Sequence, residues 1–208
     1  MPNYNSFANL IFDFGGVLLN IDTDRALQGF LNLGLSDHSV ISKEFQEGGL
    51  FDCLEKGIIS PDQFRSGIRK YLRPDVSDKD IDHAWNAMLL DLPIERLELL
   101  EKLKKNHRLF LLSNTNLIHW EAYMALIKEA HGVCLSDFFE QDYYSHNMGL
   151  RKPDPRIYQQ VLNEKALVPG ETLFIDDMLV NVEAARLLGM GGHYLDLPKG
   201  ESILDLFD

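Results

Sequence analysis

The chain has 208 residues, of which 45% are hydrophobic and 25% charged, and its formal net charge at pH 7 is −12. This length and composition are typical of a globular protein with one sizeable core, or with a core and a small inserted domain. The negative charge opposes nucleic-acid backbones and anionic membranes, so we expect neither as a partner.

Five short apolar runs predict strands, and helical patterns separate the later ones. An α/β fold follows from this alternation: a Rossmann-like parallel sheet with helices on both faces. Ligands of such sheets bind at the carboxyl ends of the strands. We expect strands at 9–14, 108–113, 138–143, 172–176 and 192–196, and helices at 118–130, 155–163 and 181–188.

A long stretch between the first two predicted strands, about residues 22–91, is helical throughout. Ser60 before Pro61, with Gln63 following, predicts one helix start, and the acidic segment after Ser77 predicts another. An insert that leaves one strand and returns before the next predicts a small second domain. We therefore expect an α/β core of residues 1–20 and 92–208 and a helical-bundle cap of residues 21–91, which would act as a lid over the sheet.

Carboxylates end two of the predicted strands. Asp13 precedes Gly15 and Gly16, and a buried charge is costly unless it is paired, binds a metal or caps a turn. Asp176 and Asp177 end the fourth strand as two adjacent like charges, which a hard divalent cation such as Mg²⁺ would stabilise.

Two further positions are candidates for anion binding. The Ser113 hydroxyl and the backbone N–H of Asn114 can together hold a phosphate or carboxylate oxygen, although Ser-Asn after a strand is also ordinary turn chemistry. Lys152 stands just before a predicted helix that begins with Asp154 and Pro155, a position suited to an anion, although a lysine in a loop is commonly solvated.

The order and context of these motifs resemble the haloacid dehalogenase superfamily, with a helical, C1-type cap inserted after the first motif. The segments at 12–17, 113–116 and 149–155 are most similar to the sugar-phosphate phosphatase branch that includes bacterial glucose-1-phosphate phosphatases. The resemblance implies a Mg²⁺-dependent phosphatase that hydrolyses a small phosphorylated metabolite, expected to be a sugar phosphate.

The resemblance also implies a role for each motif. Asp13 would attack phosphorus and form an aspartyl-phosphate, which splits one difficult displacement into two easier ones. Positioning and charge stabilisation would supply most of the catalysis. The implied metal ligands are Asp13, the Gly15 carbonyl, Asp176 and Asp177, and the implied phosphoryl-binding groups are Ser113, the Asn114 amide and Lys152.

Gly15 departs from the family pattern, because most phosphatases of this superfamily have a second Asp there as general acid. Losing a general acid typically costs about 10²–10⁴-fold in rate. Another acid could replace it, with Asp22 the nearest downstream, although a surface or capping role suits that residue as well. Alternatively, the substrate has a good leaving group, such as the anomeric oxygen of a sugar 1-phosphate; the branch resemblance favours this interpretation.

Two other functions are compatible with Gly15. The chain could be a slow or non-catalytic phosphate-binding relative. It could also be a metal-independent 2-haloacid dehalogenase, which lacks the second Asp too; Asp176 and Asp177 argue against this, since the fourth motif of those enzymes resembles Ser-Ser-Asn.

The sequence also predicts where the protein resides. Residues 1–6 lack the basic start and apolar stretch of a signal peptide, and no apolar run is long enough to span a bilayer. Cys53 and Cys134 are too few and too far apart to indicate a disulfide framework or a zinc site. We expect a cytoplasmic protein that is a monomer or a homodimer.

Overall fold

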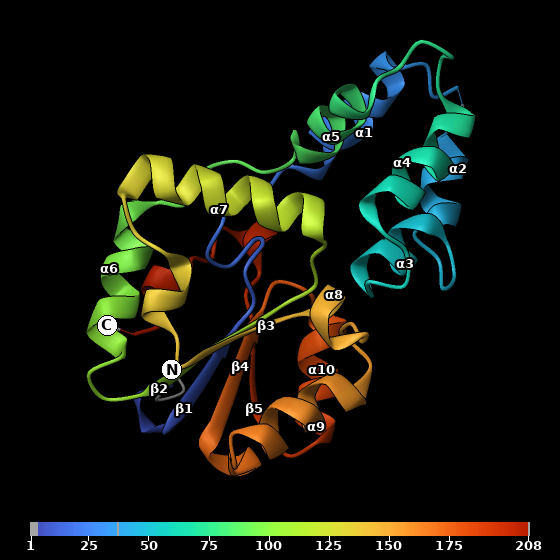
Figure 1. Ribbon diagram of the computed structural model, residues 1–208. Helices are drawn as coiled ribbons and strands as arrows, with labels where there is room; N and C mark the ends of the chain where they lie inside the picture. Colours follow the sequence, from blue (N-terminus) through green and yellow to red (C-terminus); the bar gives the residue numbers. More distant parts are fainter. Residues whose placement is uncertain (1–3, 37, 208) are drawn as a thin grey trace.

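A five-stranded parallel sheet organises the computed structural model, which describes residues 4–36 and 38–207 (Figure 1). Residues 1–3 lie outside the described residues; they are part of the segment 1–6, whose sequence lacks the features of a signal peptide. The strand order is β3-β2-β1-β4-β5. The strands are β1 Asn9–Phe12, β2 Arg108–Ser113, β3 Gln141–Tyr144, β4 Thr172–Asp176 and β5 Gly191–Tyr194.

Alternate residues of β1 enter two separate apolar cores, because successive side chains of a strand point to opposite faces of the sheet. Leu10 and Phe12 belong to the core beneath helices α6 and α7, whereas Ile11 belongs to the core beneath α9 and α10. Figure 1 shows one pair of helices on each side of the sheet. These helices are α6 Ile94–Leu103, α7 Leu117–His131, α9 Pro155–Glu164 and α10 Leu179–Leu187.

The insert forms a helical bundle with a third apolar core, built around Phe30, Phe51, Phe64 and Trp85 and joined by Ile118 of α7. The predicted cap of Ser60 is confirmed as a capping box with Gln63, and Ser77 forms another. The helices are α1 Thr23–Asn32, α2 His38–Glu44, α3 Leu50–Glu55, α4 Pro61–Ile68 and α5 Asp78–Asn86, with the short α8 Ser145–Met148 below them in the core.

The two chain segments that join core and insert run side by side. Ile21 and Leu89 form an antiparallel bridge, and the N–H of Asn20 donates to the carbonyl of Asp91 at 2.9 Å. We propose this neck as the boundary between a core of residues 1–20 and 92–208 and a cap of residues 21–91.

Several predicted element ends were wrong. The first strand ends at Phe12 instead of residue 14, and the fifth spans 191–194 instead of 192–196. The third begins at Gln141, because the apolar residues before it form the 3₁₀ helix Leu135–Phe138, which packs into the core without strand pairing. The other 3₁₀ helices are Tyr4–Ser6, Arg69–Tyr71, Pro169–Glu171, Leu197–Lys199 and Ile203–Asp205. Within the described residues, no helix combines the length and apolar character needed to cross a bilayer.

Candidate active site

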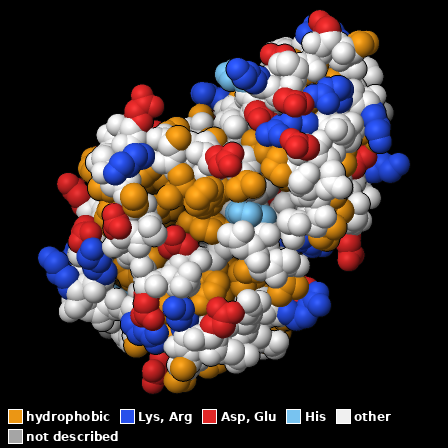
Figure 2. Space-filling model, in the orientation of Figure 1, with side chains coloured by type: hydrophobic (Ala, Val, Ile, Leu, Met, Phe, Trp, Pro, Cys, Tyr) orange, Lys and Arg blue, Asp and Glu red, His pale blue; other side chains and the backbone are white. Residues whose placement is uncertain are grey.

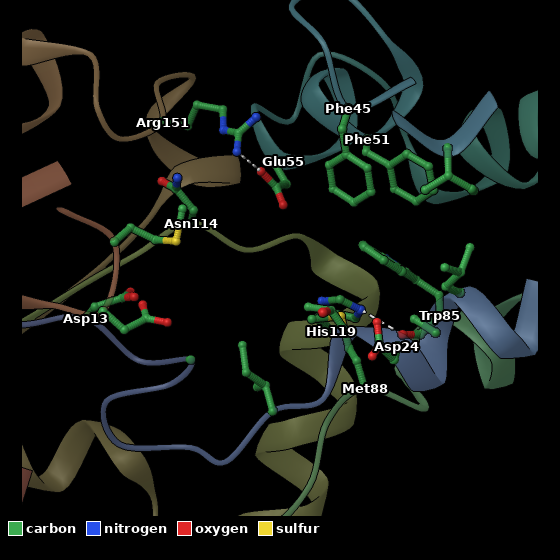
Figure 3. Close-up of a pocket in the computed structure, with 18 of the residues that line it drawn as sticks. Asp13, Asp24, Phe45, Phe51, Glu55, Trp85, Met88, Asn114, His119 and Arg151 are labelled. Carbon is green, nitrogen blue, oxygen red and sulfur yellow. Dashed lines mark hydrogen bonds and ion pairs between the residues drawn. The ribbon is translucent and has the colours of Figure 1, made fainter. Parts of the chain in front are cut away.

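A cavity of about 720 Å³ lies between the core and the insert. The core contributes residues that follow β1, β2 and β4, so the pocket opens at the carboxyl ends of the parallel strands, where ligands of such sheets bind. Figure 3 shows Asp13 and Asn114 on one side of this space and Phe45, Phe51 and Trp85 on the other. The core lining is Asp13, Gly15, Asn114, His119, Arg151, Lys152, Asp177, Met178, Asn181 and Leu197.

Three carboxylates meet at the core end of the pocket. One oxygen from each of Asp13, Asp176 and Asp177 lies within 4.8 Å of the others. This donor set fits Mg²⁺, which prefers carboxylate oxygens and retains several water ligands. A divalent cation there would also offset the mutual repulsion of the three charges.

Two of these carboxylates have raised pKa values. Burial raises the pKa of Asp13 to about 7; Lys152 opposes this shift, and the neighbouring Asp176 and Asp177 add to it. Burial, followed by the charge of Asp176, raises the pKa of Asp177 to about 6. The site therefore favours an additional positive charge.

Lys152 is buried between two of these acids. Only 2% of the residue is exposed, and Nζ lies 2.7 Å from Oδ1 of Asp13 and 2.7 Å from Oδ2 of Asp176. Burial alone would lower the Lys152 pKa, but the two carboxylates outweigh it and raise that pKa. The interpretation of Lys152 as a solvated loop lysine is therefore wrong.

Asn114 fixes the loop that carries Lys152. Its side chain donates to the Lys152 carbonyl at 2.9 Å and accepts from the Lys152 N–H at 2.8 Å. The helix cap predicted at Asp154 is confirmed, with Pro155 in the first turn of α9. Asn114 thus positions the lysine through its side chain, while its backbone N–H stays a predicted phosphate donor.

Asp176 is oriented by Asn181 on α10. The Asn181 amide donates to both oxygens of Asp176, at 3.0 and 3.1 Å, and the Met178 N–H donates to Oδ1 at 2.8 Å. The Tyr158 hydroxyl in turn donates to the carbonyl of Asn181 at 3.0 Å. This network keeps a fully buried carboxylate in one orientation.

The two glycines after Asp13 meet different constraints. Gly16 has a φ of +80°, and a Cβ there would lie 2.5 Å from Oδ2 of Asp177. Only glycine fits such a position without moving the acid. Gly15 borders the pocket, and a Cβ there would meet only the flexible tip of Ile21 at 3.3 Å.

Neither Ser113 nor Asp22 lines the pocket formed by the described residues. Ser113 is 3% exposed at the end of β2 but stands behind the pocket surface formed by the described residues; its phosphate contact stays a prediction. Asp22 caps α1 by accepting from the Asp24 N–H at 3.1 Å. Asp22 therefore performs the capping role, whereas its neighbour Asp24 lines the pocket.

Two pocket residues had no role in the sequence interpretation. Arg151 pairs across the pocket with Glu55 at 3.0 Å and with Asp52 at 3.4 Å, both on α3. Burial lowers the pKa of His119 to about 4, so its neutral ring donates from Nε2 to the Trp85 carbonyl at 3.2 Å. Both join core to insert, and their partners are too distant in sequence for spacing to reveal them.

Comparison with known proteins identifies the family. Residues 7–189 match the model of the haloacid dehalogenase-like hydrolases. The chain belongs to this family. It is an enzyme of the hydrolase class, and its parallel sheet is the fold of the family's solved structures.

Its relatives include a protein named as a phosphatase and solved structures of the same family. A D-ribitol-5-phosphate phosphatase of Bacteroides thetaiotaomicron is 32% identical over 183 residues, covering 87% of this chain and 88% of its own. A HAD family enzyme of the same organism, solved with magnesium and inorganic phosphate, is 40% identical with a TM-score of 0.83 over 90% of this chain and 93% of its own. A predicted HAD-like hydrolase of Porphyromonas gingivalis is 31% identical, with a TM-score of 0.82 over 91% of each chain.

Proposed function

We propose that this hydrolase is a Mg²⁺-dependent phosphatase that acts on a small phosphate monoester through an aspartyl-phosphate at Asp13. The observation that carries the proposal is the convergence of Asp13, Asp176 and Asp177 with the buried Lys152 at the end of the pocket. A relative solved with magnesium and inorganic phosphate supports the cation and the reaction class.

In the first step a carboxylate oxygen of Asp13 forms a bond to phosphorus, and the bond from phosphorus to the alcohol oxygen breaks. In the second step a water oxygen bonds to phosphorus and the bond from phosphorus to the Asp13 oxygen breaks, which releases inorganic phosphate and restores the carboxylate; the proton that water loses balances the proton that the departing alkoxide gained from solvent. Lys152, with Ser113 and the Asn114 N–H, would neutralise the phosphoryl oxygens. Asp13, the Gly15 carbonyl, Asp176 and Asp177 would hold Mg²⁺, which when bound supplies further charge stabilisation.

The substrate class we propose is a phosphorylated sugar or sugar alcohol. Two observations support it: the motif resemblance to glucose-1-phosphate phosphatases, and the relative that acts on D-ribitol 5-phosphate. An anomeric leaving group would suit Gly15, because a stabilised alkoxide requires less protonation. We also propose that the insert is a C1-type cap, and the cytoplasmic location and the monomeric or dimeric state stay predictions.

A substrate panel tests the proposal. Phosphate release is measured from glucose 1-phosphate, D-ribitol 5-phosphate and p-nitrophenyl phosphate, with and without Mg²⁺, with Asp13→Asn as the inactive control. Metal-dependent release supports the phosphatase. Halide release from 2-chloropropionate without metal would establish the dehalogenase instead. Tight phosphate binding with no turnover on any ester would establish a non-catalytic relative.

A further inference from the structure

The pocket changes character along its length. Its core end is polar and holds the phosphate-binding candidates described above. Of the twelve lining residues that the insert contributes, nine are apolar, and only Thr23, Asp24 and Glu55 are polar. The cavity thus has a charged core side and a mostly apolar insert side.

Four of these nine apolar residues are aromatic, and Phe45 is the one whose ring is well exposed, at 37%, while Phe30, Phe51 and Trp85 are at most 4% exposed. Phe45 stacks on Phe51 with ring centroids 4.2 Å apart and planes 3° apart, and Trp85 lies 4.8 Å from Phe51 and 6.0 Å from Phe45. The indole Nε1–H of Trp85 is buried without a hydrogen-bond partner among the described residues. Figure 3 shows these side chains facing the pocket from the side opposite Asp13.

An unsubstituted sugar phosphate uses only part of this space. Its hydroxyls require hydrogen-bonding partners, and a site that leaves them against apolar side chains binds them poorly. A cavity of about 720 Å³ lies in the range that accommodates ligands much larger than a pentitol phosphate. Aromatic rings in a pocket wall favour a flat, apolar ligand group, with which they stack.

We propose that the substrate is a phosphorylated sugar or alditol that carries an aromatic ring system at the end far from phosphorus. The exposed ring of Phe45, stacked on the buried Phe51 and close to the buried Trp85, forms the subsite for that ring. Thr23 and Asp24 supply polar groups on the insert side, and the phosphate lies at Asp13. The unpartnered indole N–H is suited to an acceptor atom of a heterocycle. This inference rests on the proposed phosphatase function and narrows its substrate class.

Two matched substrate pairs test the ring subsite. Flavin mononucleotide is a ribityl phosphate bearing a tricyclic ring, so D-ribitol 5-phosphate is its ring-free counterpart; adenosine 5′-monophosphate and ribose 5-phosphate form the second pair. We expect kcat/KM to be at least about tenfold higher for the ring-bearing member of one pair, since stacking on aromatic side chains supplies that much discrimination. Equal or lower kcat/KM for the ring-bearing member in both pairs would overturn the proposal.

A variant links the preference to the subsite. Phe45 lies in the loop between α2 and α3 and is 37% exposed, so Phe45→Ala removes a ring without emptying the cap core. The ratio of the two kcat/KM values should fall about tenfold. Ile58→Ala, which truncates a 64% exposed apolar residue of the insert outside the pocket lining, is the control and should leave the ratio unchanged.

The outcomes distinguish a failure of the ring subsite from a failure of the proposed phosphatase function. If no ester, p-nitrophenyl phosphate included, releases phosphate with Mg²⁺, the proposed function fails. If phosphate is released but Phe45→Ala lowers kcat/KM equally for both members of the preferred pair, the phosphatase stands and the ring subsite is overturned.

Discussion

Lys152 and Asp13 form a buried ion pair, with Nζ and Oδ1 2.7 Å apart, at the point where the sheet meets the pocket. The lysine holds the carboxylate in place and offers its charge to any phosphoryl group that arrives there. Because Asp176 contacts the same Nζ, this one ammonium group connects the residue expected to attack phosphorus with the acids expected to hold the metal.

Asp13→Asn should abolish turnover while preserving the fold, because the amide has nearly the shape of the carboxylate but cannot act as the nucleophile. We expect kcat to fall by at least about 10³-fold, measured as phosphate release, with an unchanged circular dichroism spectrum. Activity near that of the wild type would show that another residue attacks phosphorus.

The same variant reveals the protonation of Asp13 in the metal-free protein. Burial raises its pKa from 3.8 to about 7 in the folded state, so between these values the native state binds the proton more strongly than the unfolded state. Stability from this group is present at low pH and is lost as pH rises toward 7. The free energy of unfolding of Asp13→Asn, minus that of the wild type, should therefore increase from pH 5 to pH 8. A difference that stays constant across this range would contradict the raised pKa.

Asp176→Ala should severely weaken the binding of the Mg²⁺ on which activity depends. The substitution removes one of the three clustered carboxylates and leaves Lys152 and Asn181 without their shared partner. A Mg²⁺ titration of activity should shift to at least about tenfold higher concentration. An unchanged titration would place the metal elsewhere.

Gly15→Asp should restore the general acid that most of the superfamily has at this position. A Cβ there would contact Ile21, at 3.3 Å from its terminal methyl group, so adding a side chain requires a shift of a few tenths of an ångström in a flexible neighbour. We expect kcat to rise about 10- to 100-fold for alkyl phosphates, which are poor leaving groups, and little for p-nitrophenyl phosphate. Gly16→Ala is the contrasting variant, since its Cβ would collide with Asp177, and it should lose Mg²⁺-dependent activity. Equal gains on both ester types for Gly15→Asp would indicate an effect other than protonation.

Much of the core could be predicted from sequence, because its signals are local. Apolar runs located the five strands, and Asp13 and Asp176 could be expected to converge since the carboxyl ends of parallel strands share one edge. Strand ends were less predictable. Phe138 is as apolar as a strand residue, but it is the last residue of a 3₁₀ helix.

The cap side of the site could be predicted only in part, because helical periodicity does not show how an inserted bundle is oriented over a sheet. The ion pair between Arg151 and Glu55 joins residues 96 positions apart. The segment 47–51 and Trp85 are candidates from the sequence for facing a substrate, although a tryptophan is more commonly a core residue of a small bundle, whereas no pattern distinguishes Phe45. Only the folded arrangement shows that they face the pocket.

The surface differs between the outer faces of the molecule and the junction of core and insert. Charged side chains are scattered over both parts, while apolar side chains gather around the junction between them (Figure 2). Because salt screens exposed charges strongly and buried charges weakly, ionic strength should act mainly on the charges of the outer surface and only slightly on Lys152 and the carboxylates buried at the pocket.

The bridge between Ile21 and Leu89 places the start and the finish of the insert beside each other. The helices beyond that bridge supply the insert side of the pocket, whereas Asp13, Lys152 and Asp177 come from the core side. Substitutions on the insert side can therefore change which ligand fits without altering the carboxylates and the lysine at the ends of the strands.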